Sequence, residues 1–191
     1  HMTFLCGLTL LLSLHNVYCG NGTLEILNTG KGGLCDPTVN QASGRFKVDS
    51  GKEYFFWSFE SRNDPANDPV FFVLSAGPGG ASSTFTISHN GPCKVSADGT
   101  SVERNAYSWT TKANVVWLDH PVGVGFSTGS PLEKTEEEVV TNIYNFIKRY
   151  FDLTRWAGIP DYHSLAVTGL GDEGKFEVNC IDCSRCPSLG H

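Results

Sequence analysis

Clusters of basic residues are absent from this chain, and so are long apolar runs and internal repeats. The 191 residues include 14 Lys and Arg against 20 Asp and Glu, giving a formal net charge of -6. No Lys/Arg cluster can follow a phosphate backbone, so nucleic acid is not expected as a partner. No apolar run reaches the roughly 18 residues of a membrane helix. A composition of 40% hydrophobic and 18% charged residues predicts one globular domain.

The longest apolar segment lies at the N-terminus and has the length of a signal-peptide core. It spans residues 4–14, and Val17 and Cys19 occupy the small-residue positions of a cleavage site before Gly20. We therefore expect residues 1–19 to be a signal peptide, the alternative being a buried N-terminal helix. The mature protein would be secreted or reach a vacuolar or lysosomal lumen, without contact with the membrane.

Two features flank this segment. His1 precedes Met2 and is interpreted as a cloning remnant, because translation would start at Met2. Asn21-Gly22-Thr23 is a glycosylation sequon, so Asn21 is a candidate glycosylation site in a luminal protein. Such tripeptides also arise by chance, and an unmodified Asn21 stays an alternative.

An even set of cysteines is also missing. Of the seven, two would leave with the signal peptide, and the five that remain are Cys35, Cys93, Cys180, Cys183 and Cys186. An oxidising lumen favours disulfides, but an odd number leaves one thiol unmatched, and the sequence does not fix the pairing. The last three have C-x-x-C-x-x-C spacing without a fourth ligand, so we expect no metal and no cofactor.

Four short segments have the composition of β-strands. An aromatic run at residues 54–59 precedes a loop rich in Asn, Asp and Pro, and residues 70–74, 114–118 and 164–168 are apolar without alternation. We expect the first two segments to pair as a hairpin. The last three should be buried on both faces and need neighbouring strands, so unpaired edges would favour self-association.

A helix is predicted between the last two of these segments. Thr135 and Glu138 form a capping box, and the residues that follow place their apolar members on one face. That face comprises Val139, Ile143, Phe146, Ile147, Tyr150 and Phe151. Strand, helix and strand in this order form a parallel crossover, so the fold class is α/β.

A glycine-rich loop directly follows the strand at 70–74, where ligands of open α/β sheets bind. It reads Ala76-Gly77-Pro78-Gly79-Gly80-Ala81-Ser82-Ser83. Glycine lets backbone N–H groups approach a developing oxyanion closely, although such a stretch is more often only a turn.

Together with other segments, this loop resembles the serine carboxypeptidases, with fungal or plant members most similar. The matching segments are residues 54–65, 76–83, 90–92, 105–109 and 119–127. The resemblance covers about residues 34–174. It implies the N-terminal portion of an α/β-hydrolase fold, a mixed sheet with flanking helices that is incomplete here. Residues 20–174 would form this partial domain, and residues 175–191 a divergent cysteine-containing tail.

The family's nucleophile lies on a Gly-Glu-Ser-Tyr-Ala-Gly turn, which aligns with residues 169–174. The serine position is Gly171, which fits a strained turn but has no oxygen to attack a carbonyl. Glu173 replaces a small residue, and Asp172 would place a carboxylate beside an oxyanion-hole amide. The resemblance therefore implies no intact catalytic residue, and the family's Asp and His would come later than this chain extends.

The resemblance also implies positions that bind the peptide C-terminus. The family's Asn and Glu for the terminal carboxylate correspond to Ser75 and Leu170, both degenerate, while Gly77, Pro78 and Gly79 keep the loop. The N–H of Gly77 carries over to the oxyanion hole, and that of Asp172 is its doubtful second donor.

Ser127 is an alternative candidate for the nucleophile. Gly125-Phe126-Ser127-Thr128-Gly129 matches G-x-S-x-G, with Asp119 and His120 close in sequence. We do not expect Ser127 to act, because a nucleophile elbow needs a strand entering and a helix leaving. Two functions stay open: a serine carboxypeptidase, which releases C-terminal residues of peptides but is truncated and inactive alone here, and a secreted non-catalytic homologue that binds peptides or a protein.

Overall fold

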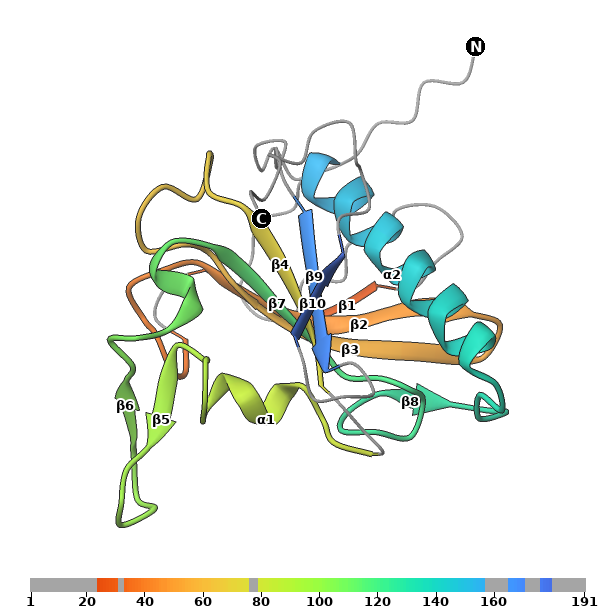
Figure 1. The fold of residues 1–191 in the computed structure, drawn as a ribbon, viewed down its shortest axis with the longest axis horizontal. Coiled ribbons are helices and arrows are strands. Elements are labelled where there is room, and N and C mark those ends of the chain that lie inside the picture. Colours follow the sequence, from red (N-terminus) through yellow and green to blue (C-terminus); the bar gives the residue numbers. More distant parts are fainter. Residues whose placement is uncertain (1–23, 31–32, 76–78, 157–164, 171–175, 180–191) are drawn as a thin grey trace, which may run out of the picture.

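A mixed β-sheet with one long helix against it forms the body of the protein (Figure 1). A computed structural model describes residues 24–30, 33–75, 79–156, 165–170 and 176–179. The strands are β1 (Leu24–Gly30), β2 (Gln41–Asp49), β3 (Lys52–Phe59), β4 (Val70–Leu74), β5 (Cys93–Val95), β6 (Val102–Arg104), β7 (Asn114–Leu118), β8 (Thr128–Gly129), β9 (Leu165–Leu170) and β10 (Phe176–Asn179). The helices are α1 (Ser83–Thr86), the 3-10 turn η1 (Trp109–Thr111) and α2 (Glu136–Trp156).

The sheet combines antiparallel and parallel parts. Its order is β1-β2-β3-β7-β4-β9-β10, with β8 paired to β3, while β5 and β6 form a separate hairpin. β7, β4 and β9 are mutually parallel, and their flanking partners are antiparallel. The connection from β7 through α2 to β9 passes over β4. This arrangement confirms the predicted α/β class, and the apolar runs at 70–74 and 114–118 are β4 and β7.

The expected hairpin between β3 and β4 is wrong, because β7 lies between them. With β7 between them, β3 and β4 lie two strand spacings apart, about 10 Å. The loop that joins β3 to β4 is long enough to cross this distance. Asn114, at the start of β7, holds this loop: its amide donates to two loop carbonyls at 3.0 Å, and its Oδ1 accepts from Ser61 N–H. The hairpin that does form joins β2 to β3 through Gly51, whose φ of +74° suits glycine.

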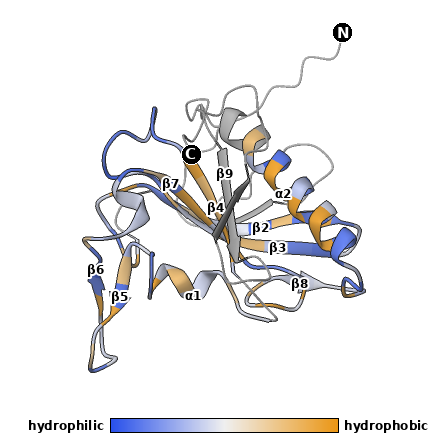
Figure 2. Ribbon diagram, in the orientation of Figure 1, coloured by the Kyte–Doolittle hydropathy of each residue, from blue (hydrophilic) through white to orange (hydrophobic). Residues whose placement is uncertain are grey.

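Alternate side chains of the central strands enter two apolar clusters, one on each face. The cluster beneath α2 contains Phe46, Val48, Tyr54, Phe56, Val70, Phe72, Val116, Leu118, Val122, Phe146, Ile147 and Tyr150. The opposite cluster contains Cys35, Val39, Phe59, Val73, Cys93, Ala113, Val115 and Trp117. β7 is buried along its whole length, as predicted, whereas Phe71 and Leu74 of β4 are only half-buried. Figure 2 shows β4 and β7 as hydrophobic strands.

Helix α2 begins and packs largely as predicted. Thr135 Oγ1 accepts from Glu138 N–H at 3.3 Å, but the Glu138 carboxylate accepts from Lys134 N–H, one residue before the predicted partner. Phe146 and the other predicted apolar residues are buried or half-buried against the sheet. In the described part of the chain, no helix has both the length and the hydropathy of a membrane span.

Candidate functional site

Serine side chains fold the loop after β4 back on itself. Ser75 N–H donates to Ser82 Oγ at 2.8 Å, and Ser75 Oγ donates to the carbonyl of Gly80. Ser82 is fully buried, whereas Gly79, with a φ of +85°, has open space where a Cβ would stand. Ser75, Gly80 and Ser82 are therefore linked by hydrogen bonds, while Gly79 borders open space. These residues lie at the carboxyl end of β4, where ligands of such sheets bind.

A buried carboxylate at the end of β7 joins this loop to the next one. Asp119 is fully buried; its Oδ1 accepts from Ser83 N–H at 2.8 Å, and its Oδ2 accepts from Ser83 Oγ and Phe126 N–H at 2.9 and 3.1 Å. A Cβ on Gly125 would lie 2.1 Å from Asp119 Oδ2 and 2.9 Å from Ala81 Cβ. Only glycine permits this approach, so the loops after β4 and β7 form one unit below the sheet (Figure 1).

Strand β9 brings the second half of the predicted site alongside. It lies parallel to β4, with Val70 opposite Leu165 and Val73 opposite Thr168. Two residues further in this register, Ser75 is level with Leu170, so the two positions aligned with the family's carboxylate-binding residues are neighbours. The Ser75 hydroxyl is already hydrogen-bonded within its loop, and leucine has no polar side-chain atom. This pair cannot bind a carboxylate as an Asn and a Glu would.

The chain leaves β9 as a hairpin. β10 returns antiparallel to β9, with Phe176 opposite Leu170 and Asn179 opposite Val167. A nucleophile elbow requires a strand that turns directly into a helix, which presents the nucleophile at the top of the sheet. Here the next described element after β9 is a strand. Residues 171–175, with Gly171 and Asp172, lie in this connection and outside the described residues.

The rival nucleophile Ser127 is buried and engaged by backbone groups. Its Oγ donates to the carbonyl of Asp119 at 2.6 Å and accepts from Phe55 N–H at 2.8 Å, and it is only 2% exposed. His120 places its Nδ1 3.3 Å from the carbonyl of Leu118, and burial lowers the pKa of this imidazole. Ser127 is followed by β8 and not by a helix, so it lacks the strand–turn–helix context of a nucleophile elbow.

Several predicted positions lie outside the described residues. They are residues 1–19, Asn21, Gly77, Pro78, Gly171, Asp172 and the tail from Cys180 onward. In the described ranges no three His, Cys, Asp or Glu side chains gather where they could hold a metal ion.

Sequence reasoning missed the structural role of Asp119. Apart from its place in the matching segment 119–127, the sequence indicates Asp119 only as a possible catalytic partner of Ser127. Yet Asp119 directly follows a fully buried strand and precedes Gly123 and Gly125. A carboxylate in that place needs several donors, and the nearby glycines were the signal that backbone N–H groups approach it.

Comparison with known proteins identifies relatives for most of the described chain. The profile of the serine carboxypeptidase family matches residues 33–158. Carboxypeptidase Y of Saccharomyces cerevisiae is 44% identical over 119 residues, which cover 61% of this chain and 22% of that protein. The lysosomal protective protein of Mus musculus is 35% identical over 144 residues, which cover 73% of this chain and 29% of that protein.

A solved structure shares the fold over most of this chain. A prohormone-processing carboxypeptidase from Saccharomyces cerevisiae superposes with a TM-score of 0.59 at 24% identity, over 71% of this chain and 32% of that chain. This likeness supports the α/β-hydrolase fold. The 191 residues span less than a third of each of these three proteins.

Proposed function

Because the chain belongs to the serine carboxypeptidase family, we propose that it forms the oxyanion-loop side of that family's site and does not hydrolyse peptides by itself. The observation that supports the proposal is that β10 pairs antiparallel with β9, where a nucleophile elbow would lead from the strand into a helix. The resemblance in sequence would put Gly171 at the serine position. Acyl transfer needs an oxygen nucleophile next to a base. Gly171 has no side-chain oxygen to act as this nucleophile.

What the chain retains is the support for an oxyanion hole. Oxyanion donors stabilise charge only if they are fixed before the reaction, and the described residues on either side of Gly77 are held by hydrogen bonds: Ser75 N–H donates to Ser82 Oγ, and Ser83 N–H donates to Asp119. Gly77 N–H is the donor that we assign to this hole. Peptide C-termini are the ligand class of the parent site, but Ser75 and Leu170 would bind the terminal carboxylate weakly.

We further propose that the protein enters the secretory pathway. Residues 1–19 would be its signal peptide, residues 20–174 the hydrolase-like domain and residues 175–191 a divergent cysteine-containing tail, of which residues 176–179 form β10 of the sheet. A vacuolar serine-type carboxypeptidase of Saccharomyces cerevisiae is 37% identical over 126 residues, and the mouse relative is lysosomal by name. Secretion, or delivery to such a lumen, fits these relatives and the disulfide between Cys35 and Cys93.

Two assays test the absence of hydrolysis. The chain is incubated with a fluorophosphonate probe that labels nucleophilic serines, and with an N-blocked dipeptide whose C-terminal residue is quantified after release. We expect neither labelling nor release. Gly171→Ser should also stay unlabelled, because a serine in the β9–β10 connection lacks an activating histidine. Ser127→Ala is the matched control. Stoichiometric labelling of the unaltered chain, or peptide release by Gly171→Ser, would refute the proposal.

The alternative function is a non-catalytic homologue that binds peptides or a protein. It is favoured by the hydrogen bonding of the loops after β4 and β7, which does not depend on any catalytic residue. Self-association is a competing use of the same chain, because β1 and β10 each pair on one side only in the described sheet. Size-exclusion chromatography with light scattering separates the two: oligomers that grow with concentration indicate edge pairing, and a constant monomer excludes it.

A further inference from the structure

Helix α2 carries a second apolar pair on the side that faces away from the sheet. Val140 and Tyr144 are 58% and 56% exposed, and they lie four positions apart, so they are neighbours on the helix surface. The residues of α2 in the core are others, among them Phe146, Ile147 and Tyr150. Because α2 runs along the outside of the molecule, Val140 and Tyr144 remain open to solvent (Figure 1).

A charged residue lies at each end of this apolar pair. Glu137 comes three positions before Val140, and Lys148 comes four positions after Tyr144. Residues at these spacings share one face of a helix, which also includes Thr141. Both charged side chains are exposed, and within the described part of the chain neither makes a hydrogen bond or an ion pair. We call these five residues the outer stripe of α2.

The outer stripe is complementary to itself when it is reversed. Glu137 and Lys148 are eleven positions apart, or about 16 Å along the helix axis. If a second α2 packs antiparallel across the first, centred between residues 142 and 143, Glu137 of each copy faces Lys148 of the other. Val140 of each copy then faces Tyr144 of the other. In a parallel pair, by contrast, Glu137 would face its own counterpart, and the like charges would repel.

We propose that the outer stripe of α2 is an interface between two copies of this chain. The charge pattern identifies the occupant, because the acidic and basic ends of the stripe match each other in an antiparallel pair. A single helix pair is a small contact, so we expect a dissociation constant on the order of 100 µM.

This contact differs from pairing at the sheet edges in how it ends. A two-fold contact uses the same patch on both copies and closes at the dimer. Pairing at the free sides of β1 and β10 can continue into larger assemblies. The interface is also independent of the proposed function, because no residue of the outer stripe belongs to the loops after β4 and β7.

Sedimentation equilibrium of the full chain, from about 10 to 500 µM, measures this dimer. We expect monomer and dimer without larger species. Glu137→Lys and Lys148→Glu should each weaken dimerisation at least about tenfold, because each substitution places two like-charged pairs in a symmetric contact. Thermal unfolding should change little, since both side chains are exposed.

Mixing the two variants separates this interface from every other mode of association. A dimer of one Glu137→Lys chain with one Lys148→Glu chain contains two opposite-charge pairs, so dimerisation should return to within about threefold of the unaltered chain. Glu103→Lys and Lys94→Glu, on the exposed β5–β6 hairpin, change the net charge equally and should leave dimerisation unaltered.

Three results would overturn the interface. The first is an unaltered chain that stays monomeric over the whole concentration range. The second is a mixture of the two variants that associates no better than either variant alone. The third is equal association of each variant and the unaltered chain, which is the behaviour expected of edge pairing.

Discussion

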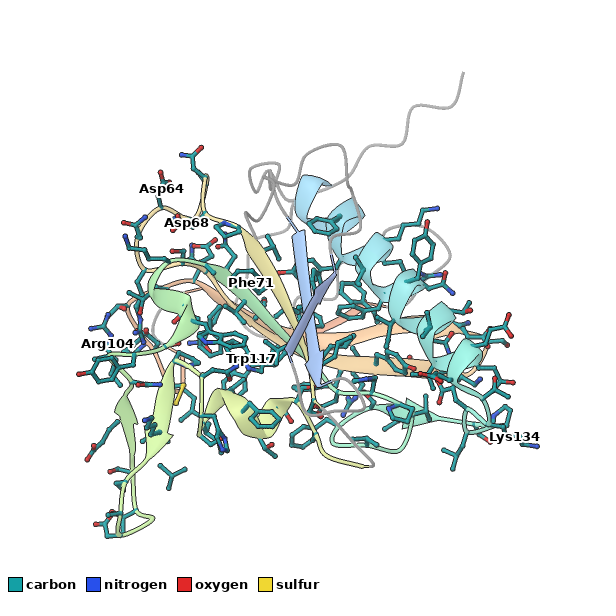
Figure 3. The ribbon with its side chains drawn as sticks, viewed as in Figure 1. Asp64, Asp68, Phe71, Arg104, Trp117 and Lys134 are labelled. Atoms are coloured by element: carbon teal, nitrogen blue, oxygen red, sulfur yellow. A yellow bond between two sulfur atoms is a disulfide. The ribbon has the colours of Figure 1, made fainter. Side chains whose placement is uncertain are left out.

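The two faces of the sheet are covered in different ways. On one face α2 lies over an aromatic cluster in which Phe146 and Tyr150 contact Phe56 and Phe72, with ring centroids 5.4 to 6.2 Å apart. On the other face, loops and the one-turn helix α1 cover Trp117 and the Cys35–Cys93 disulfide (Figure 3).

The difference follows from where backbone hydrogen bonds are made. A helix satisfies its own N–H and C=O groups, so α2 can cover the sheet with apolar side chains alone. Loops do not satisfy their own N–H and C=O groups in this way, so the backbone groups that they bury need side-chain partners. Arg62 supplies them here: it donates to the carbonyls of Asn105 and Pro92 at 2.6 and 2.9 Å and forms an ion pair with Asp36 at 2.6 Å. The loop face thus depends on a few polar links.

The largest effect should come from breaking the link at Arg62. Asp36 is fully buried and the Arg62 side chain only 8% exposed, so Arg62→Met leaves a buried carboxylate with Arg104, at 3.6 Å, as its remaining cation among the described residues. We expect the free energy of unfolding in urea to fall by about 3–5 kcal/mol. Phe146→Leu is the control on the helix face and should cost under about 1.5 kcal/mol. A loss below 1 kcal/mol for Arg62→Met would contradict the comparison.

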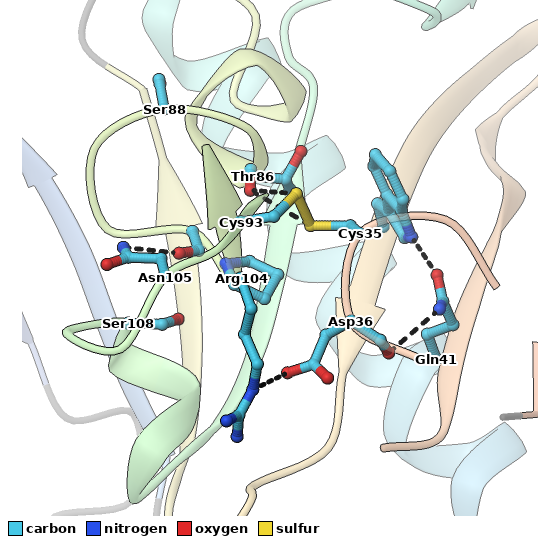
Figure 4. The surroundings of a disulfide bond; sticks show 12 residues. Cys35, Asp36, Gln41, Thr86, Ser88, Cys93, Arg104, Asn105 and Ser108 are labelled. Atoms are coloured by element: carbon cyan, nitrogen blue, oxygen red, sulfur yellow. Dashed lines mark hydrogen bonds and ion pairs between the residues drawn. A yellow bond between two sulfur atoms is a disulfide. The ribbon is translucent and has the colours of Figure 1, made fainter. Parts of the chain in front are cut away.

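Removing the disulfide should cause the second-largest loss of stability. Cys35 and Cys93 are 58 residues apart in sequence, and their bond joins the segment before β2 to β5 (Figure 4). Closing a loop of this length restricts the unfolded chain, so Cys35→Ala/Cys93→Ala should cost about 2–4 kcal/mol. Thermal unfolding of the two proteins, with and without reductant, measures it. Reductant should lower the midpoint of the unaltered protein alone, and an equal response would show that this bond contributes nothing.

Acid should weaken the loop face selectively. Burial alone would raise the pKa of Asp36, but hydrogen bonds from Thr38 and the Arg62 guanidinium lower this pKa below its usual value. A carboxyl with a lowered folded pKa stabilises the protein above its unfolded pKa, and the contribution is lost as pH falls through the folded value. We expect the stability difference between the unaltered protein and Asp36→Asn to shrink from about pH 5 downward. If the stability difference between the two proteins does not change with pH, the Asp36 carboxylate is not the cause of the loss of stability in acid.

The contrast between the two faces also explains what the sequence could reveal. Apolar runs and helical periodicity report burial, and they located β4, β7 and α2 correctly. Strand order depends on contacts between distant segments, so nothing near residues 54–74 indicated that β7 would separate β3 from β4. The role of Asp119 was equally hidden, because its partners Ser83 and Phe126 meet it only after folding.

The smallest effect should appear where the helix face contains a polar link of its own. Tyr54 is fully buried, and its hydroxyl donates to Glu133 Oε1 at 2.9 Å. Burial raises the pKa of Tyr54, so the hydroxyl keeps its proton and stays a donor. Glu133 keeps two further donors, the Asn142 amide at 2.8 Å and Val122 N–H at 3.0 Å. Tyr54→Phe should therefore cost only about 1–2 kcal/mol.

Urea unfolding at pH 7 of Tyr54→Phe and of Tyr144→Phe measures this link. Tyr144 is 56% exposed, so loss of its hydroxyl should change the free energy of unfolding by less than about 0.5 kcal/mol. Asn142→Ala combined with Tyr54→Phe should cost more than the sum of the single changes, because Glu133, a half-buried carboxylate, then retains only one of its three donors. A merely additive double variant would show that the Tyr54 and Asn142 donors are not coupled through Glu133. A loss for Tyr54→Phe as large as the loss at Arg62 would show that the helix face, like the loop face, depends on polar links.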